Sequence, residues 1–135
     1  MLKAFFIACK AHKGQKDKAG KMYIFHPLTV AKYTKGRKGK IVALLHDVVE
    51  DSSITIDDLK KYGFTDEITH AVDAITKRAG EAYYDYLQRV KSDEIARAVK
   101  ISDLMHNSNL ARLKAITEKD VERTIRYQNS IKFLL

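Results

Sequence analysis

The sequence predicts an all-α fold, and three features of its 135 residues favour this class. The chain contains one proline and six glycines, so few positions would interrupt a helix. Its apolar residues recur at three- and four-residue intervals. No alternating run of β-branched residues is long enough for a strand. We therefore expect one domain over residues 1–135, built as a bundle of about seven or eight helices.

The first half of the chain predicts three helices. The first covers 2–13, where one face carries Leu2, Phe5, Phe6 and Cys9. A charged loop with glycines at both ends follows it. Pro27 then lies in the first turn of a short helix over 27–34, where its missing N–H does no harm. A basic turn with two glycines leads into a third helix over 41–51.

The second half predicts five more helices. They are a short helix capped by Ser53 or Thr55 and ended by Gly63, amphipathic helices over 66–77 and 81–91, a long helix over 93–114, and a last helix. Thr117 and Asp120 have the spacing of a capping box at the start of that last helix. Its side chains expected to face the core are Val121, Ile125, Ile131 and Leu134.

The composition excludes several classes of protein. No apolar run approaches the roughly 20 residues that span a bilayer, so we expect no membrane association. The N-terminal segment turns polar after nine residues and lacks a small-residue cleavage site, which argues against a secretory signal. Cys9 is the single cysteine, so a disulfide framework and a cysteine-based zinc cluster are excluded. The expected location is the cytoplasm.

The charge is unevenly distributed along the chain. Residues 1–40 hold eleven Lys or Arg and one acid, a balance of +10, whereas 41–135 hold fourteen bases and sixteen acids, a balance of −2. A basic first third can hold a polyanion, either nucleic acid or a phosphorylated small molecule. It can equally be a set of solvated lysines. Because no basic stripe interleaved with aromatic residues is present, we do not expect nucleic acid as the partner.

The helix expected over 41–51 combines an apolar surface with four titratable residues. Its apolar positions occur on all sides, which predicts burial. The titratable residues are His46, Asp47, Glu50 and Asp51. His46 and Glu50 are four residues apart and Asp47 and Glu50 three apart, so these groups share a face. Buried acids are usually paired or coordinate a cation. In the simpler alternative, His46 and Asp47 form a satisfied core pair and the later acids lie at a solvated helix end.

Two further segments supply polar residues in apolar surroundings. Asp103 lies among Ile101, Leu104 and Met105, and Asn107 lies one turn later on the same face. His26 stands just before Pro27 at a junction of loop and helix. The candidate metal ligands are therefore His26, His46, Asp47 and Asp103. Mixed nitrogen and oxygen ligands without thiolate suit Mn²⁺, Fe²⁺ or Zn²⁺. Glu50 and Asp51 would then orient or deprotonate a water.

Five segments together resemble a known family. They are AHKGQ (11–15), YIFHPL (23–28), ALLHDVVEDS (43–52), AITK (74–77) and ISDLMHN (101–107). These motifs resemble the HD-type hydrolase domain of the Rel/Spo alarmone enzymes, and their order resembles that of the single-domain small alarmone hydrolases. The resemblance implies an all-α HD bundle. It also implies a Mn²⁺-dependent enzyme, for which another divalent metal is possible, that removes the 3′-pyrophosphate of (p)ppGpp to give GDP or GTP.

The resemblance also implies roles for individual residues. It implies that His26, His46, Asp47 and Asp103 bind the metal. It also implies that Glu50 and Asp51 activate the attacking water. The substrate would be contacted by Lys18, Asn107 and Lys77. From its spacing on the last helix, Tyr127 could close the pocket, although a surface pair with Arg123 is the simpler interpretation. Lys77 could likewise serve only to complement a helix dipole, and His106 is expected to pack rather than to bind metal.

Asp17 is a departure from the family pattern. The resemblance places an arginine that helps to hold the guanine base at this position, so guanine specificity does not follow from the sequence. The second hypothesis is therefore a phosphohydrolase of the same architecture that acts on another phosphorylated nucleotide, such as NADPH or a (deoxy)nucleotide. The third is a helical nucleic-acid-binding module, whose affinity would fall steeply with salt. The sequence does not reveal the oligomeric state.

Overall fold

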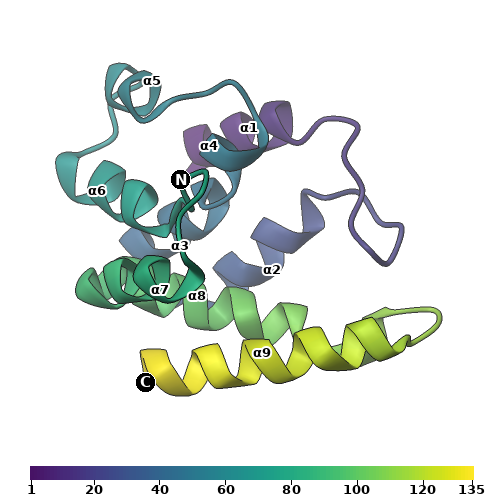
Figure 1. Ribbon diagram of the computed structural model, residues 1–135. Helices are drawn as coiled ribbons and strands as arrows, with labels where there is room; N and C mark the ends of the chain where they lie inside the picture. Colours follow the sequence, from purple (N-terminus) through teal and green to yellow (C-terminus); the bar gives the residue numbers. More distant parts are fainter.

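The computed structural model describes all 135 residues and is built of helices, with one isolated bridge between Lys16 and Met22 (Figure 1). The α-helices are α1 (Leu2–Ala11), α2 (Phe25–Tyr33), α3 (Arg37–Leu45), α4 (Val48–Asp51), α5 (Ile56–Lys61), α6 (Asp66–Ile75), α7 (Tyr83–Ser92), α8 (Glu94–Asn107) and α9 (Glu118–Leu134). A 3₁₀ turn, η1, covers Leu110–Arg112. The predicted all-α class is confirmed. None of these helices combines the length and apolar character that crossing a bilayer requires.

Helices α3 and α8 form the centre of the bundle. All five residues from Ile41 to Leu45 are buried, as the apolar run predicted. Helix α3 packs against α1, α2, α6 and α8, and α8 also packs against α7 and α9. In Figure 1, α9 runs along α8 at one end of the molecule, far from α5. Polar side chains at the C-terminal end of α3 and in the middle of α8 are therefore held within the most closely packed part of the protein.

The helix expected over 41–51 is interrupted. It starts earlier, at Arg37, and α3 ends at Leu45, before His46 and Asp47 form a turn that leads into α4. The Nδ1 atom of His46 lies 2.6 Å from the carbonyl oxygen of Ala43, a contact that satisfies one carbonyl left free at the helix end. Asp47 has φ −103° and ψ −2°, outside regular helix. The interruption places two candidate ligands in a turn rather than on a continuous helix.

Capping residues mark the starts of several other helices. Thr55 and Thr117 each form the full capping box, with Asp58 and Asp120 respectively. The long helix expected over 93–114 ends at Asn107, because Ser108 and Asn109 turn the chain into η1. The side chain of Asn109 accepts a hydrogen bond from the N–H of Ala111 in that turn. This early end brings the 109–113 segment back towards the start of α9.

Two predicted apolar faces differ from the observed ones. In α1 the buried residues are Ala4 and Ala8, whereas Leu2 and Phe6 are exposed. Small side chains let α1 approach α3 closely, and this packing overrides the larger apolar residues. In α9, Val121 and Ile125 were expected to face the core but are exposed, whereas Leu134 is buried as expected; Thr124 and Ser130 are also buried. The inner face of the first half of α9 is polar because it borders a cavity.

Candidate functional site

Three helices bring potential metal ligands together in the interior. His26 comes from the first turn of α2, His46 follows the end of α3, and Asp103 lies in α8. All three side chains are buried. One ligand atom from each lies within 4.8 Å of the others. Residues that are 20 and 57 positions apart in the chain are thereby gathered at one point.

The fourth predicted ligand lies beside this triad. The Oδ2 atom of Asp47 is 3.0 Å from Nε2 of His46 and 3.8 Å from Nε2 of His26. The Oδ1 atom of Asp103 is 2.9 Å from Nε2 of His26 and 3.5 Å from Nε2 of His46. All four candidate residues therefore direct an imidazole nitrogen or a carboxylate oxygen into the same small volume.

The protonation pattern of His46 fits a cation at this point. Its Nδ1 atom contacts a backbone carbonyl, which requires the hydrogen to be on Nδ1. Its buried Nε2 atom has no hydrogen-bond partner, although it faces oxygen atoms of Asp47 and Asp103. A lone pair facing two carboxylates needs a positive charge between them. Burial opposes such a charge, but these two aspartates raise the pKa of His46 well above its ordinary value. A proton or a metal ion can therefore supply the charge.

His106 completes the orientation of His26. Nδ1 of His106 lies 2.8 Å from Nδ1 of His26, and the two rings are stacked. Burial and the nearby Arg112 lower the pKa of His106 to about 4, so His106 is neutral and can accept a hydrogen bond near neutral pH. If His26 donates from Nδ1, its Nε2 is free for the cluster. Metal-binding histidines commonly have such a hydrogen bond at the second nitrogen.

The two carboxylates are held by further side chains. Lys100 donates to Oδ2 of Asp103 at 2.9 Å, and Asn107 donates to Oδ1 of Asp103 at 3.1 Å. Tyr23 donates its hydroxyl hydrogen to Oδ2 of Asp47 at 2.5 Å. Burial opposes ionisation of both acids. However, Lys100 and the histidines hold the pKa of Asp103 well below its ordinary value, and His46 lowers that of Asp47 to about 2. Both acids are therefore anionic at neutral pH.

Glu50 and Asp51 lie on α4, outside the ligand triad. Oε1 of Glu50 accepts a hydrogen bond from the backbone N–H of Lys77 at 2.6 Å. Desolvation raises the pKa of Glu50, with Asp47 adding to the effect. Burial and the same neighbour also raise the pKa of Asp51. An acid with a raised pKa accepts a proton more readily, which suits a general base.

The segment that contacts Glu50 is fastened by Arg89 of α7. Its guanidinium donates to the carbonyl oxygens of Ala74 and Thr76 at 3.3 and 2.9 Å. It also forms an ion pair with Glu81, which lies just before α7. The connection between α6 and α7 is thus tied to α7 on both sides of Lys77. This fixes the position of the amide that contacts Glu50.

A cavity of about 310 Å³ adjoins the cluster, and His26 belongs to both. The other lining residues are Lys16, Asp17, Lys18, Tyr23, Asn107, Asn109, Leu110, Arg112, Leu113, Asp120, Arg123, Thr124 and Tyr127. Its volume lies in the range of small-molecule sites, about 300–1,000 Å³. Four of these side chains are basic and two acidic, so the cavity attracts an anion. Burial and the neighbouring Arg123 lower the pKa of Lys18.

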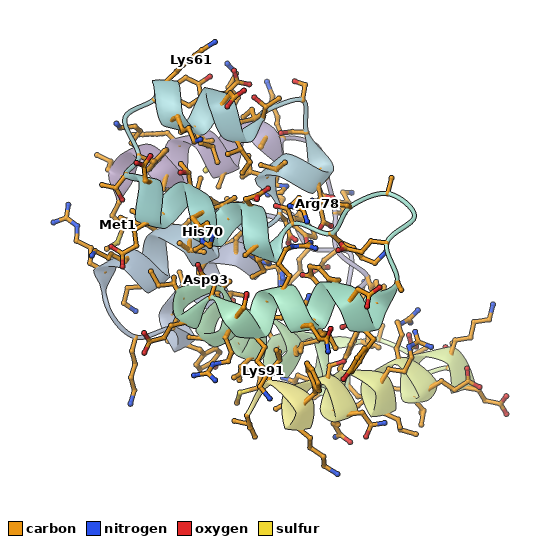
Figure 2. All side chains as sticks on the ribbon, turned by 60° about the vertical axis from the view of Figure 1, so that its left-hand side comes forward. Met1, Lys61, His70, Arg78, Lys91 and Asp93 are labelled. Atoms are coloured by element: carbon orange, nitrogen blue, oxygen red, sulfur yellow. The ribbon has the colours of Figure 1, made fainter.

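The structure places the predicted substrate-contacting residues in two groups. Lys18, Asn107 and Tyr127 line the cavity. Lys77 does not, because its backbone contacts Glu50 and its side chain is exposed. Among the remaining histidines, His70 pairs with Asp93 on the outer surface, where both are labelled in Figure 2. His12 is buried, with Nδ1 2.9 Å from Oε1 of Gln15.

Sequence reasoning missed four residues that support the cluster. Lys100 precedes Asp103 by three positions in a helix and so shares its face, a spacing that could have indicated the contact. Tyr23 begins the YIFHPL segment, but its spacing in the sequence does not point to Asp47. His106 was expected to pack, and its contact with His26 was not anticipated. Nothing in the sequence around Arg112 indicates its contacts with the His106 carbonyl and with Asp17.

The chain is similar in sequence to several proteins of known name. No family model matches the chain. A probable GTP pyrophosphokinase of Mycobacterium leprae is 32% identical over 123 residues, covering 82% of this chain and 16% of that protein. A guanosine-3′,5′-bis(diphosphate) 3′-pyrophosphohydrolase of Spiroplasma citri is 33% identical over 121 residues, covering 78% of the chain and 16% of that protein. A protein of the same name from Borreliella burgdorferi is 38% identical over 81 residues, which cover 57% of this chain and 12% of that protein.

The chain is similar in sequence to one segment of these GTP pyrophosphokinases and (p)ppGpp pyrophosphohydrolases. It spans about a sixth of the length of the relatives from M. leprae and S. citri. A solved structure described as that of a metazoan orthologue of SpoT that hydrolyses ppGpp has a TM-score of 0.79 with it. That match covers 98% of this chain and 83% of the other, at 18% identity. It establishes that the chain shares the helical fold of that structure.

Proposed function

We propose that this protein is a metal-dependent hydrolase that removes the 3′-pyrophosphate of (p)ppGpp, giving GDP or GTP and pyrophosphate. The observation that carries the proposal is the buried triad of His26, His46 and Asp103 next to a basic cavity that His26 also lines. A hydrolase of a polyanionic nucleotide needs both features, a site for a divalent cation and basic residues around the substrate. The names of the relatives from S. citri and B. burgdorferi describe the same reaction.

Mn²⁺ is the proposed cofactor, and another divalent cation can serve in its place. The residues that would hold it are His26, His46, Asp47 and Asp103. Two imidazoles and two carboxylates form a donor set suited to Mn²⁺, Fe²⁺ or Zn²⁺. The unpartnered Nε2 atom of His46 supports this assignment. When bound, the cation supplies a Lewis acid that makes hydroxide available near neutral pH and offsets phosphate charge.

Glu50 and Asp51 are the proposed proton acceptors. In the reaction, a water oxygen forms a bond to the phosphorus attached to the 3′-oxygen, and the bond between that phosphorus and the 3′-oxygen breaks. One of these carboxylates takes the proton of the water, and the proton can then pass to the leaving 3′-oxygen. The raised pKa values of both groups suit them to this exchange. The hydrogen bond from Lys77 keeps Glu50 in one orientation.

The cavity residues bind and orient the nucleotide. Lys18 offsets phosphate charge, and Asn107 donates to Asp103 while lining the cavity, so it connects the nucleotide to a metal ligand. Tyr127 forms part of the wall on α9. Lys77, which lies outside the cavity, acts in this proposal through its backbone contact with Glu50.

A second candidate substrate is another phosphorylated nucleotide, such as NADPH or a (deoxy)nucleotide. The observation that favours it is the state of Asp17, whose carboxylate is engaged by Arg112 and by two backbone amides. A carboxylate occupied in this way does not hold a base as an arginine would. The metal cluster and the proton acceptors would serve either substrate equally.

The full chain loaded with Mn²⁺ is expected to release pyrophosphate from ppGpp. The measurement is turnover of ppGpp, NADPH and a set of nucleoside and deoxynucleoside phosphates under identical conditions, with EDTA-treated protein as the blank. Hydrolysis of another nucleotide with ppGpp left intact would replace the first substrate by the second. Failure to hydrolyse any of them, in protein shown to retain Mn²⁺, would contradict the enzymatic proposal.

The pH dependence of turnover is expected to report the ionisation of the Glu50 carboxyl group. As a base, Glu50 must be ionised, so the rate should rise with pH through its pKa. Since desolvation raises that pKa, the midpoint should lie above the ordinary glutamate value of 4.5. In Glu50→Gln this acidic limb should disappear and the rate should fall by about a hundredfold to ten-thousandfold. An unchanged profile in that variant would assign the proton transfer to another group, with Asp51→Asn as the next test.

A further inference from the structure

An ion pair connects two distant segments across the wall of the cavity. Nη2 of Arg112 lies 3.1 Å from Oδ2 of Asp17, and the two residues are 95 positions apart in the chain. Only 9% of the Asp17 side chain and 19% of that of Arg112 are exposed. Both residues line the cavity. The pair is therefore part of the interior of the site rather than a contact on the surface.

Further hydrogen bonds fix the plane of the Arg112 guanidinium. Its Nη1 atom donates to the carbonyl oxygen of His106 at 3.2 Å. The Oδ1 atom of Asp17 accepts from the N–H groups of Ala19 and Lys21 at 2.9 and 3.0 Å, which holds the carboxylate in place. A guanidinium held at two of its nitrogens by different partners cannot rotate freely. What it can offer a ligand is chiefly its flat face.

The surroundings of Arg112 suit a heterocycle better than a phosphate. Its charge is already offset by Asp17, and Arg123 is paired with Asp120 in the same way. Lys16 and Lys18 are the lining cations outside these ion pairs, and both are exposed to an incoming anion. The neighbours of Arg112 that line the cavity include Leu110 and Leu113. A flat cation among apolar side chains is a surface on which nucleobases stack.

We propose that Arg112 binds the base of the nucleotide through the face of its guanidinium and that Asp17 is its positioning residue. The inference rests on the proposed function in that the cavity must take a nucleotide. It places the base against the 110–113 segment, with the phosphates at Lys16, Lys18 and the metal ligands. Stacking of this kind recognises that a base is present and tolerates different bases, so the cavity selects nucleotides over simple phosphate esters.

The experiment compares a ligand that has a base with one that lacks it. Binding of GDP and of pyrophosphate to the full chain is measured by calorimetry for the native protein, Arg112→Ala, Arg112→Lys and Asp17→Asn. Arg112→Ala should weaken GDP binding by about tenfold to a hundredfold and leave pyrophosphate binding unchanged. Arg112→Lys should not restore GDP binding, because an ammonium has no flat face. Asp17→Asn should weaken GDP binding to a smaller extent.

Arg126→Ala is the matched control, since this exposed arginine of α9 lies outside the cavity lining. It removes the same charge and should leave the ratio of GDP to pyrophosphate affinity unchanged. An equal loss for both ligands in Arg112→Ala would show a phosphate contact, and no loss for either would show a purely structural pair; each result overturns the proposal. If Arg112→Ala does not fold, Arg112→Lys decides the same comparison. A chain that binds GDP through Arg112 but leaves ppGpp intact would overturn only the proposed reaction.

Discussion

Asp103→Asn should abolish tight Mn²⁺ binding and, with it, hydrolysis. Asp103 lies at the centre of the cluster, within 3.5 Å of both imidazole Nε2 atoms. The substitution keeps the shape of the side chain and removes its charge. Changes to residues that merely support a ligand weaken metal binding by about tenfold to a hundredfold, so loss of a ligand charge should exceed this. Turnover should fall by about a thousandfold or more, which corresponds to several kcal/mol of Lewis-acid stabilisation.

The measurements are calorimetric titration of EDTA-treated protein with Mn²⁺ and the rate of phosphate-ester hydrolysis at saturating metal. Asp73→Asn is the control, because Asp73 also pairs with a basic residue, Arg78, but lies outside the cluster. Thermal unfolding of both variants shows whether the fold is retained. Native Mn²⁺ affinity in a folded Asp103→Asn variant would mean that the cation binds elsewhere, and the cluster would lose its assigned role.

Lys100→Met should destabilise the metal-free protein strongly, and Mn²⁺ should reverse most of this effect. The Lys100 and Asp103 side chains are 16% and 6% exposed. Removing one partner of a buried ion pair usually costs about 3–5 kcal/mol, because the other charge is left without compensation. A bound divalent cation would supply that compensation. The variant should therefore gain more stability from Mn²⁺ than the native protein does.

Chemical denaturation with and without Mn²⁺ measures both quantities. Lys38→Met is the matched control: Lys38 pairs with Glu67 on the surface, where the side chains are 59% and 54% exposed. Such pairs contribute about 1 kcal/mol or less, so this variant should behave like the native protein. A metal-free Lys100→Met variant as stable as the native chain, or a loss that Mn²⁺ leaves unchanged, would refute the idea that lysine and metal share one counter-charge.

The fold class could be predicted from the sequence because its signals are local. Helical spacing, Pro27, a cap at Ser53 or Thr55 and the capping box of Thr117 and Asp120 each depend on residues within a few positions of one another. The apolar run from Ile41 to Leu45 likewise predicted burial, since no face of it was polar. The interruption at His46 and Asp47 was not predicted, because neither residue by itself disfavours a helix strongly. In the structure, the break coincides with a contact between the His46 ring and the carbonyl oxygen of Ala43, and with a hydrogen bond from Tyr23 to the Asp47 carboxylate.

The proximity of the candidate ligands could also be inferred from the sequence. A carboxylate in apolar surroundings needs a partner, and this requirement singles out Asp47 and Asp103 as candidates. Their roles in metal binding remain predictions. The partner of Asp17 could not be inferred, because Arg112 is 95 residues away and no periodicity connects them. From the sequence alone, Asp17 was only a departure from a family pattern; the structure shows that it belongs to an ion pair within the cavity.

The Arg89 contacts hold the segment beside Glu50 from a different helix than those that carry the proposed metal ligands. The groups gathered around Asp103 come from α2, α3 and α8, whereas the amide beside Glu50 belongs to a connection tied to α7. A substitution in α7 that loosens Arg89 would thus act first on the segment that orients the Glu50 carboxylate, and only indirectly on Asp103, through the packing of α7 against α8. Under the proposed function, substitutions around Arg89 are therefore expected to change the rate of hydrolysis more than they change the affinity for the cation.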